Sequence, residues 1–161
     1  MAKDIVMIHG ANEGGWCFDQ FKAVFAGFGW TCPAPDLIGH GLNADKNGSA
    51  LVGVGIADYL NELETFLKSI EPMPVLLGHS TGAVLAQQLA AKGLVHALVL
   101  VCPAPRAGIL PQTDGEKQLG QDLMGLGAFW KTVINPDFDL ARDAQLHPRG
   151  GSTGRVRQIR A

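Results

Sequence analysis

The pentapeptide GHSTG at residues 78–82 constrains the fold more than any other part of the sequence. The apolar run at residues 75–77 predicts a short buried strand that leads into it, and the alanine-rich residues 81–91 predict a helix that leaves it. A strand that passes directly into a helix makes a very tight turn, which only small residues on either side allow. The glycines at both ends of the pentapeptide meet this need, so we predict a sharp strand-to-helix turn at Ser80.

Short apolar runs alternate along the chain with longer stretches whose apolar residues recur at helical spacing, which indicates βαβ units and a parallel sheet. Strands are predicted at residues 4–8, 30–34, 75–77 and 96–102. The continuous apolar character of the last two is typical of strands that are buried on both faces. In the second, Pro33 and Pro35 cannot donate ladder hydrogen bonds, so this strand is expected to leave the sheet early or to lie at its edge.

Helices are predicted between these strands. The first has an inner face made by four apolar residues, which are Phe21, Val24, Phe25 and Phe28. The clearest helix places apolar side chains from Val54 to Ile70 on one face, and Pro72 ends it. We therefore predict one domain over residues 1–145, with its core at about 4–105 and a lid-like helical segment at about 106–145. Residues 146–161 carry four arginines and no acidic residue, which predicts a disordered, polar and basic tail.

Composition excludes several classes of function. The 161 residues are 47% hydrophobic and 17% charged, as expected of one folded domain, and the formal net charge of −2 offers no basic face to nucleic acid. No apolar run approaches the ~20 residues of a membrane helix, and no export signal is visible, so a soluble, cytoplasmic protein without a membrane partner is expected. The three cysteines lack metal-binding spacing, which predicts buried structural thiols, with no metal and no cofactor.

A serine at such a turn has its hydroxyl raised above the sheet at a helix N-terminus, where the helix dipole favours negative charge. This is typical of a nucleophile; the alternative is a serine that only caps the helix. Acyl transfer also needs two N–H donors for the oxyanion, one after the nucleophile and one from the loop after an earlier strand, where the segment HGAN at residues 9–12 lies. We predict Ser80 as the nucleophile and the amides of Ala11 and Thr81 as the oxyanion donors. Taken alone, His-Gly would indicate only a turn.

Three segments together resemble the α/β-hydrolase family. The segment HGANEGGWCFDQF at residues 9–21 is similar to the oxyanion loop and first helix of small plant-type esterases and hydroxynitrile lyases. The segment DLIGHG at residues 36–41 is similar to the D-x-x-G-H-G segment after the second strand of many members, and GHSTG is a common spelling of the elbow. The resemblance implies an α/β-hydrolase fold: a partial, doubly wound, mostly parallel sheet with helices on both faces and a helical lid segment.

The expected spatial order of the strands is second, first, third, fourth. The fourth strand would then be an exposed edge. Such an edge invites self-association, because its backbone N–H and C=O groups are unpaired.

Membership would further imply that a histidine takes the serine proton and that an acid orients this histidine, in the chain order serine, acid, histidine. The acid and the base follow two later strands, yet no strand-like run follows Cys102, so the chain is expected to be C-terminally truncated. The order is nominally present in Asp143 and His147, with Asp137 and Asp139 as other acids, although these can equally be ordinary solvated neighbours on a helix. His9 and His40 are expected to organise loops, as they do in family members.

The lineage implies a carboxylester or acyl hydrolase that uses Ser80 on a small, apolar-leaning ester or acyl substrate. As written, the chain is expected to be an incomplete hydrolase. Two alternatives are an active esterase whose base is atypically placed or supplied by another chain, and a non-catalytic pseudo-hydrolase that binds a small apolar ligand. Ester hydrolysis and lyase chemistry share this scaffold and are not separated by the sequence.

Overall fold

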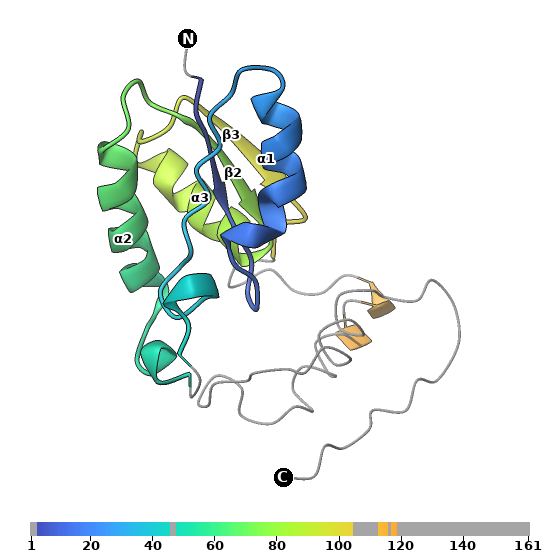
Figure 1. The fold of residues 1–161 in the computed structure, drawn as a ribbon. Coiled ribbons are helices and arrows are strands. Elements are labelled where there is room, and N and C mark those ends of the chain that lie inside the picture. Colours follow the sequence, from blue (N-terminus) through green and yellow to red (C-terminus); the bar gives the residue numbers. More distant parts are fainter. Residues whose placement is uncertain (1–2, 46–47, 105–112, 116, 119–161) are drawn as a thin grey trace.

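The computed structural model describes residues 3–45, 48–104, 113–115 and 117–118. Within this part of the chain the centre is a parallel sheet in the order β1-β2-β3, with β1 at Ile5–Ile8, β2 at Val75–His79 and β3 at Ala97–Val101 (Figure 1). The middle strand is β2, since Val75 pairs with Ile5 of β1 and with Ala97 of β3. The predicted parallel α/β architecture is confirmed.

Helices cover both faces of this sheet (Figure 1). Helix α1 (Asp19–Ala26) lies on one face, and α2 (Ile56–Lys68) and α3 (Thr81–Ala91) lie on the other. In the described part of the chain, short 3-10 helices lie in the connections: η1 (Gly15–Phe18), η2 (Gly41–Asn43) and η3 (Ser49–Leu51). Because successive strand residues point to opposite faces, Val6 and Ile8 of β1 join the core on the α2 and α3 side, while Ile5 and Met7 pack with Phe18 on the other.

The clearest predicted helix is α2. Leu63 and Leu67 are buried at 1% and 2% exposure, and Tyr59, Leu60, Phe66 and Ile70 pack against the same core, whereas Ile56 is 44% exposed. The helix begins at Ile56, later than the stripe suggests, because the Asp58 carboxylate accepts the Gly55 N–H at 2.8 Å and so caps the first turn there. The predicted helix at residues 81–91 coincides with α3.

The predicted strand at residues 30–34 forms only an isolated bridge between Asp4 and Thr31, so this prediction is corrected. The amides of Ile5 and Met7 donate to the carbonyls of Thr31 at 2.8 Å and Pro33 at 2.9 Å. Pro33 has no N–H to return, and the ladder therefore ends. The segment still lies beside β1, so the predicted spatial order of the four runs is kept.

Strand β3 is largely exposed, which contradicts its predicted burial on both faces. Val99 is 42% exposed and Leu100 is 40% exposed. In the described part of the chain β3 pairs only with β2, so it is an edge strand, and its apolar side chains lack the neighbours that a central strand would have. The exposed edge was expected from the strand order, whereas self-association through it stays a prediction.

Helix α1 contributes less to the core than its sequence predicts. Of the four residues assigned to its inner face, Phe25 packs against the core and Phe21 contacts the buried Phe18 with its ring edge-on, but Phe21, Val24 and Phe28 are 48%, 61% and 78% exposed. The helix ends at Ala26, so Phe28 lies beyond it. The sheet face is covered instead by Phe18 of η1 and by side chains of residues 30–34.

The predicted tail at residues 146–161 and nearly all of the lid-like segment at 106–145 lie outside the described residues, so the domain limits stay predictions. Among the described helices, none is long and apolar enough to cross a membrane.

Candidate active site

Ser80 lies at the turn between β2 and α3, with backbone angles φ 51° and ψ −117°. A positive φ is uncommon and strained for a residue other than glycine, and it persists only where the surroundings hold it. Here the Ser80 amide donates to the Val101 carbonyl at 3.1 Å. The Ser80 carbonyl accepts the amides of Ala83 and Ala104, both at 3.1 Å. The sharp turn is thus fixed to the end of β3 on one side and to α3 on the other.

Close backbone contacts require both glycines of the elbow. A Cβ on Gly82 would lie 2.3 Å from the carbonyl oxygen of Ile8 and 2.4 Å from that of His9. A Cβ on Gly78 would lie 2.6 Å from the Cα of Ala83. Such atoms essentially never approach closer than 3.0 Å, so neither position accepts a side chain without movement of the backbone. The start of α3 therefore packs directly on the end of β1.

The loop that follows β1, residues 9–12, lies against this elbow. Ile8 pairs with Gly78 in the sheet, so the loop and the elbow leave the sheet at the same end. A Cβ built on Gly10 would lie only 3.0 Å from the Cβ of Ser80. The structure thus brings together the two motifs from which the nucleophile and the oxyanion donors were predicted.

A small cavity of about 120 Å³ lies beside the elbow. Both residues predicted as oxyanion donors, Ala11 and Thr81, line it. The other lining residues are Gly10, Leu37, His40, Tyr59 and Leu85. Two backbone amides that stabilise one oxyanion must face the same space, and this cavity is a space that both residues share.

Comparison with known proteins identifies the family. Residues 5–158 match the sequence profile described as the alpha/beta hydrolase family. The chain belongs to the alpha/beta hydrolase family. The resemblance noted from the three sequence motifs is thereby confirmed.

Individual relatives of this chain include a pyrethroid hydrolase and a methylesterase. A pyrethroid hydrolase from Sphingobium wenxiniae is 34% identical over 116 residues, which are 68% of this chain and 39% of that protein. Methylesterase 7 from Arabidopsis thaliana is 30% identical over 87 residues, which are 52% of this chain and 32% of that protein. The chain thus spans well under half the length of these curated relatives.

A solved relative is similar to this chain in fold. It is an extracellular alpha/beta-hydrolase from a Paenibacillus species that shares structural and functional homology with tobacco salicylic acid binding protein 2. The two are 25% identical with a TM-score of 0.62, over 87% of this chain and 57% of that one.

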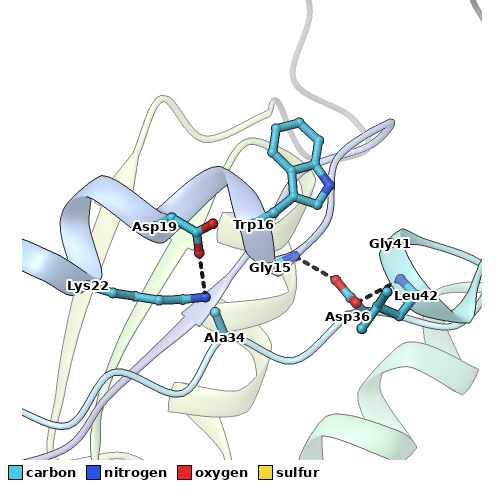
Figure 2. A pocket seen from close by; sticks show the side chains of 8 residues that line it. All are labelled: Gly15, Trp16, Asp19, Lys22, Ala34, Asp36, Gly41 and Leu42. Carbon is cyan, nitrogen blue, oxygen red and sulfur yellow. Dashed lines mark hydrogen bonds and ion pairs between the residues drawn. The ribbon is translucent and has the colours of Figure 1, made fainter.

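A second, larger cavity of about 470 Å³ lies between η1, α1 and η2 (Figure 2). Its charged groups already have partners: Lys22 pairs with Asp19 at 3.0 Å, and the two oxygens of Asp36 accept the amides of Gly15 at 2.6 Å and Leu42 at 2.8 Å. Burial would raise the pKa of Asp36, but the hydrogen bonds from these two amides outweigh it, so the pKa lies below its ordinary value. No elbow residue lines this cavity, which leaves the smaller one as the candidate active site of the hydrolase.

His9 connects the oxyanion loop to Leu37 through its ring hydrogen bonds. Its ring is fully buried, its Nε2 accepts the Leu37 amide at 3.0 Å, and its Nδ1 lies 2.8 Å from the Gly10 carbonyl oxygen. With one ring nitrogen accepting and the other donating, the imidazole is neutral, and burial lowers its pKa. The Nδ1 of His40 likewise bonds to the Ile38 carbonyl at 2.9 Å, so both histidines organise loops, as expected from the sequence.

Among the described residues, no histidine ring hydrogen-bonds to the Ser80 hydroxyl. His9, His40 and His79 are engaged with other groups. The predicted base His147 and the predicted acid Asp143 lie outside the described residues, together with Asp137 and Asp139. Their catalytic roles stay predictions.

The described residues hold no group of three or more His, Cys, Asp or Glu side chains that could bind a metal ion. Cys17 and Cys32 are half-buried, but Cys102 is exposed, so the expectation of three buried thiols is wrong for Cys102. Cys102 follows β3 directly, and it is exposed because this edge strand is exposed.

Sequence analysis missed Glu13, whose carboxylate contacts both motifs of the site. It accepts the Gly10 amide at 2.7 Å and bonds to the His79 ring at 2.9 Å. One signal was available: an acidic side chain in a glycine-rich turn, three residues after an amide that needs an acceptor. The partner from the elbow lies too far along the chain to be inferred.

Proposed function

We propose that this chain carries the nucleophile and the oxyanion site of a carboxylester or related acyl hydrolase, with Ser80 as the nucleophile. The observation that carries the proposal is the strained turn at Ser80 beside a cavity that Ala11 and Thr81 line together. A hydroxyl raised on this turn is free to approach an ester carbonyl, and the backbone amides of the two lining residues can receive the oxygen that becomes negative.

In the proposed reaction, the Ser80 oxygen bonds to the ester carbonyl carbon, and the hydroxyl proton passes to a base. The tetrahedral oxyanion binds the Ala11 and Thr81 amides. As it collapses, the base returns the proton to the leaving oxygen, so the alcohol departs and leaves an acyl-serine that water hydrolyses. The alternative of an active esterase would use His147 as the base and Asp143 as the acid, since none of the described histidines bonds to the Ser80 hydroxyl.

The proposed substrate is a small ester or acyl compound with an apolar acyl part. The cavity of about 120 Å³ is small, and Leu37, Tyr59 and Leu85 give it apolar walls. The names of two relatives, a pyrethroid hydrolase and a methylesterase, favour ester cleavage over lyase chemistry. A cytoplasmic location and the absence of nucleic-acid and membrane partners stay predictions from the sequence.

A chain without a base would instead act as a binding protein. Losing the base of a serine triad leaves only the ~10³–10⁴-fold rate over water that oxyanion stabilisation and binding supply. We therefore propose that the isolated chain is a weak hydrolase whose nucleophile is in place but not activated.

Added imidazole tests this directly, because it can replace a missing base. Hydrolysis of p-nitrophenyl acetate is measured with and without imidazole for the wild-type chain, for Ser80→Ala and for Ser69→Ala. Ser69 is an exposed serine at the end of α2, bonded to the Phe66 carbonyl, and serves as the matched control. The rate of Ser80→Ala in imidazole gives the background, because imidazole itself hydrolyses the ester. We expect the rates of wild type and Ser69→Ala in imidazole to exceed this background.

Identical rates for wild type and Ser80→Ala in imidazole would contradict the role of Ser80. Strong turnover without imidazole that disappears in Ser80→Ala would show a base within the chain, and His147 and Asp143 would be replaced first.

A further inference from the structure

The Glu13 carboxylate joins the two halves of the candidate site. Its Oε2 accepts the Gly10 amide at 2.7 Å and lies 2.9 Å from Nδ1 of His79. Gly10 belongs to the oxyanion loop, whereas His79 is the last residue of β2, directly before Ser80. One oxygen atom of Glu13 therefore bridges the oxyanion loop and His79, which lies 66 residues after Glu13 in sequence.

The bridge is partly buried. The Glu13 side chain is 11% exposed and that of His79 is 31% exposed. Hydrogen bonds to an ionised carboxylate are stronger than neutral ones, and loss of the acceptor leaves a poorly solvated N–H without a partner. Glu13 also faces the Cys17 thiol: burial, followed by the charge and hydrogen bond of Glu13, raises the pKa of Cys17 to about 12. The carboxylate thus has two hydrogen-bond partners, the Gly10 amide and the His79 ring.

The four groups around the bridge are closely packed. A Cβ built on Gly10 would lie 3.0 Å from the Cβ of Ser80, 3.1 Å from Oε2 of Glu13 and 3.3 Å from Nδ1 of His79. The loop can therefore move toward the elbow very little. The hydrogen bonds to Glu13 prevent it from moving away.

We propose that Glu13 and His79 are positioning residues that clamp the oxyanion loop onto the nucleophile elbow and so set the place of the Ala11 amide relative to Ser80. The inference rests on the proposed function for its catalytic consequence, but the clamp itself does not depend on catalysis. His79 does not hydrogen-bond to the Ser80 hydroxyl among the described contacts, so the pair acts through the backbone positions of the two motifs.

Nuclear magnetic resonance tests the clamp without any substrate. The ring nitrogen shifts of His79 should show a proton on Nδ1, because this atom donates to Glu13. In Glu13→Ala, and to a smaller extent in Glu13→Gln, hydrogen exchange of the Gly10 amide should accelerate by about tenfold, as expected when its hydrogen bond is lost, and the Ala11 and Thr81 amide signals should shift.

Glu64→Ala is the matched control. Glu64 bridges Lys68 and Lys92 with its two oxygens, away from the elbow, so its loss should leave the three amides unchanged. Unchanged exchange of the Gly10 amide in folded Glu13→Gln and Glu13→Ala would overturn the clamp. A uniform acceleration over the whole chain would overturn it too, because the role would then be general stability.

The kinetic consequence is measured in the presence of imidazole as the rate constant of Ser80 acylation and the apparent dissociation constant of the ester. Displacement of an oxyanion donor should lower the acylation rate constant of Glu13→Ala about 10- to 100-fold and leave the dissociation constant nearly unchanged. His79→Ala should have a similar effect, and Glu13→Ala/His79→Ala should be little worse than either single variant, since both remove one clamp.

Additive losses in the double variant, or acylation of Glu13→Ala within about twofold of wild type, would overturn the pairing. If wild type itself shows no acylation that depends on Ser80, the proposed function fails, and the amide exchange still decides whether the clamp exists.

Discussion

The helices on the two faces of the sheet contribute very differently to the core in the described part of the chain. On the face covered by α2 and α3, the core residues are almost fully buried: Val6, Ile8, Leu76, Leu85 and Leu89 are all 0% exposed. On the other face α1 has no buried residue. Its Val24 and the nearby Phe28 are 61% and 78% exposed.

This difference shows where the chain fixes its candidate site. The elbow and the oxyanion loop lie where β1, β2 and α3 meet, and Gly82 permits direct backbone contact there. The strain at Ser80 is held by this packing, because a strained residue keeps its conformation only when its surroundings impose it. We infer that the site depends on the α2 and α3 side and hardly at all on the outer surface of α1.

The largest expected effect is that of Gly82→Ala. Its Cβ would lie 2.3 Å from a carbonyl oxygen of β1, so α3 must move, at a cost of about 3 kcal/mol or more in the free energy of unfolding. Gly93→Ala is the control, since Gly93 has φ 73° but no atom within 4 Å of the added Cβ, and should cost only about 1 kcal/mol. Urea unfolding compares the two, and equal losses would show that the backbone contact at the elbow does not matter.

Truncation of core side chains should separate the two faces. Leu89→Ala removes a fully buried side chain of α3 and should cost about 2–5 kcal/mol. Phe28→Ala removes a larger but mostly exposed side chain and should change stability by less than about 0.5 kcal/mol. The comparison between faces would be wrong if thermal or urea unfolding gave similar losses for both variants.

A smaller effect is expected from pH through His9. Burial lowers its pKa in the folded chain below 6.5, so below that pH the unfolded chain binds a proton that the folded chain does not. The contribution of His9 to the free energy of unfolding is therefore fully present above about pH 6.5. It is lost progressively as the pH falls from there toward the pKa of His9 in the folded chain. His9→Gln should flatten this part of the profile of unfolding free energy against pH.

Asp36 serves as the control for the pH dependence assigned to His9, because it titrates at a lower pH. Its pKa is lowered below 3.8 in the folded chain, so its contribution is present above that value and is lost only at lower pH. Asp36→Asn should therefore leave the slope just below pH 6.5 intact. The assignment to His9 would be wrong if His9→Gln kept the pH dependence of the unfolding free energy just below pH 6.5 and Asp36→Asn removed it.

The sequence predicted the elbow well because its signals are local. Two glycines around Ser80, an apolar run before them and an alanine-rich stretch after them are sufficient to indicate the strand, the turn and α3. Residues whose surroundings depend on distant segments were predicted less well. Phe21 and Val24 have helical spacing, but spacing does not reveal whether a partner covers them, and the apolar run of β3 likewise does not reveal its neighbours.

The contacts that organise the candidate site were the least predictable. Glu13 and His79 are 66 residues apart, and neither stands out by type or spacing. Asp36 lies in a motif that resembles the family pattern, yet its hydrogen bonds to Gly15 and Leu42 depend on how two loops meet. Such pairs become visible only when the sheet sets the loops side by side.

The central claim is that Ser80 is a nucleophile that faces its own oxyanion site, and a trapped acyl group tests it most directly. The chain is mixed with p-nitrophenyl acetate and imidazole, quenched in acid, digested and analysed by mass spectrometry. We predict that an acetyl group accumulates on Ser80 well ahead of the exposed Ser69, and that Ser80→Ala abolishes this selective modification. An acetyl group spread equally over Ser69 and Ser80, or absent from Ser80 in the folded chain, would contradict the account.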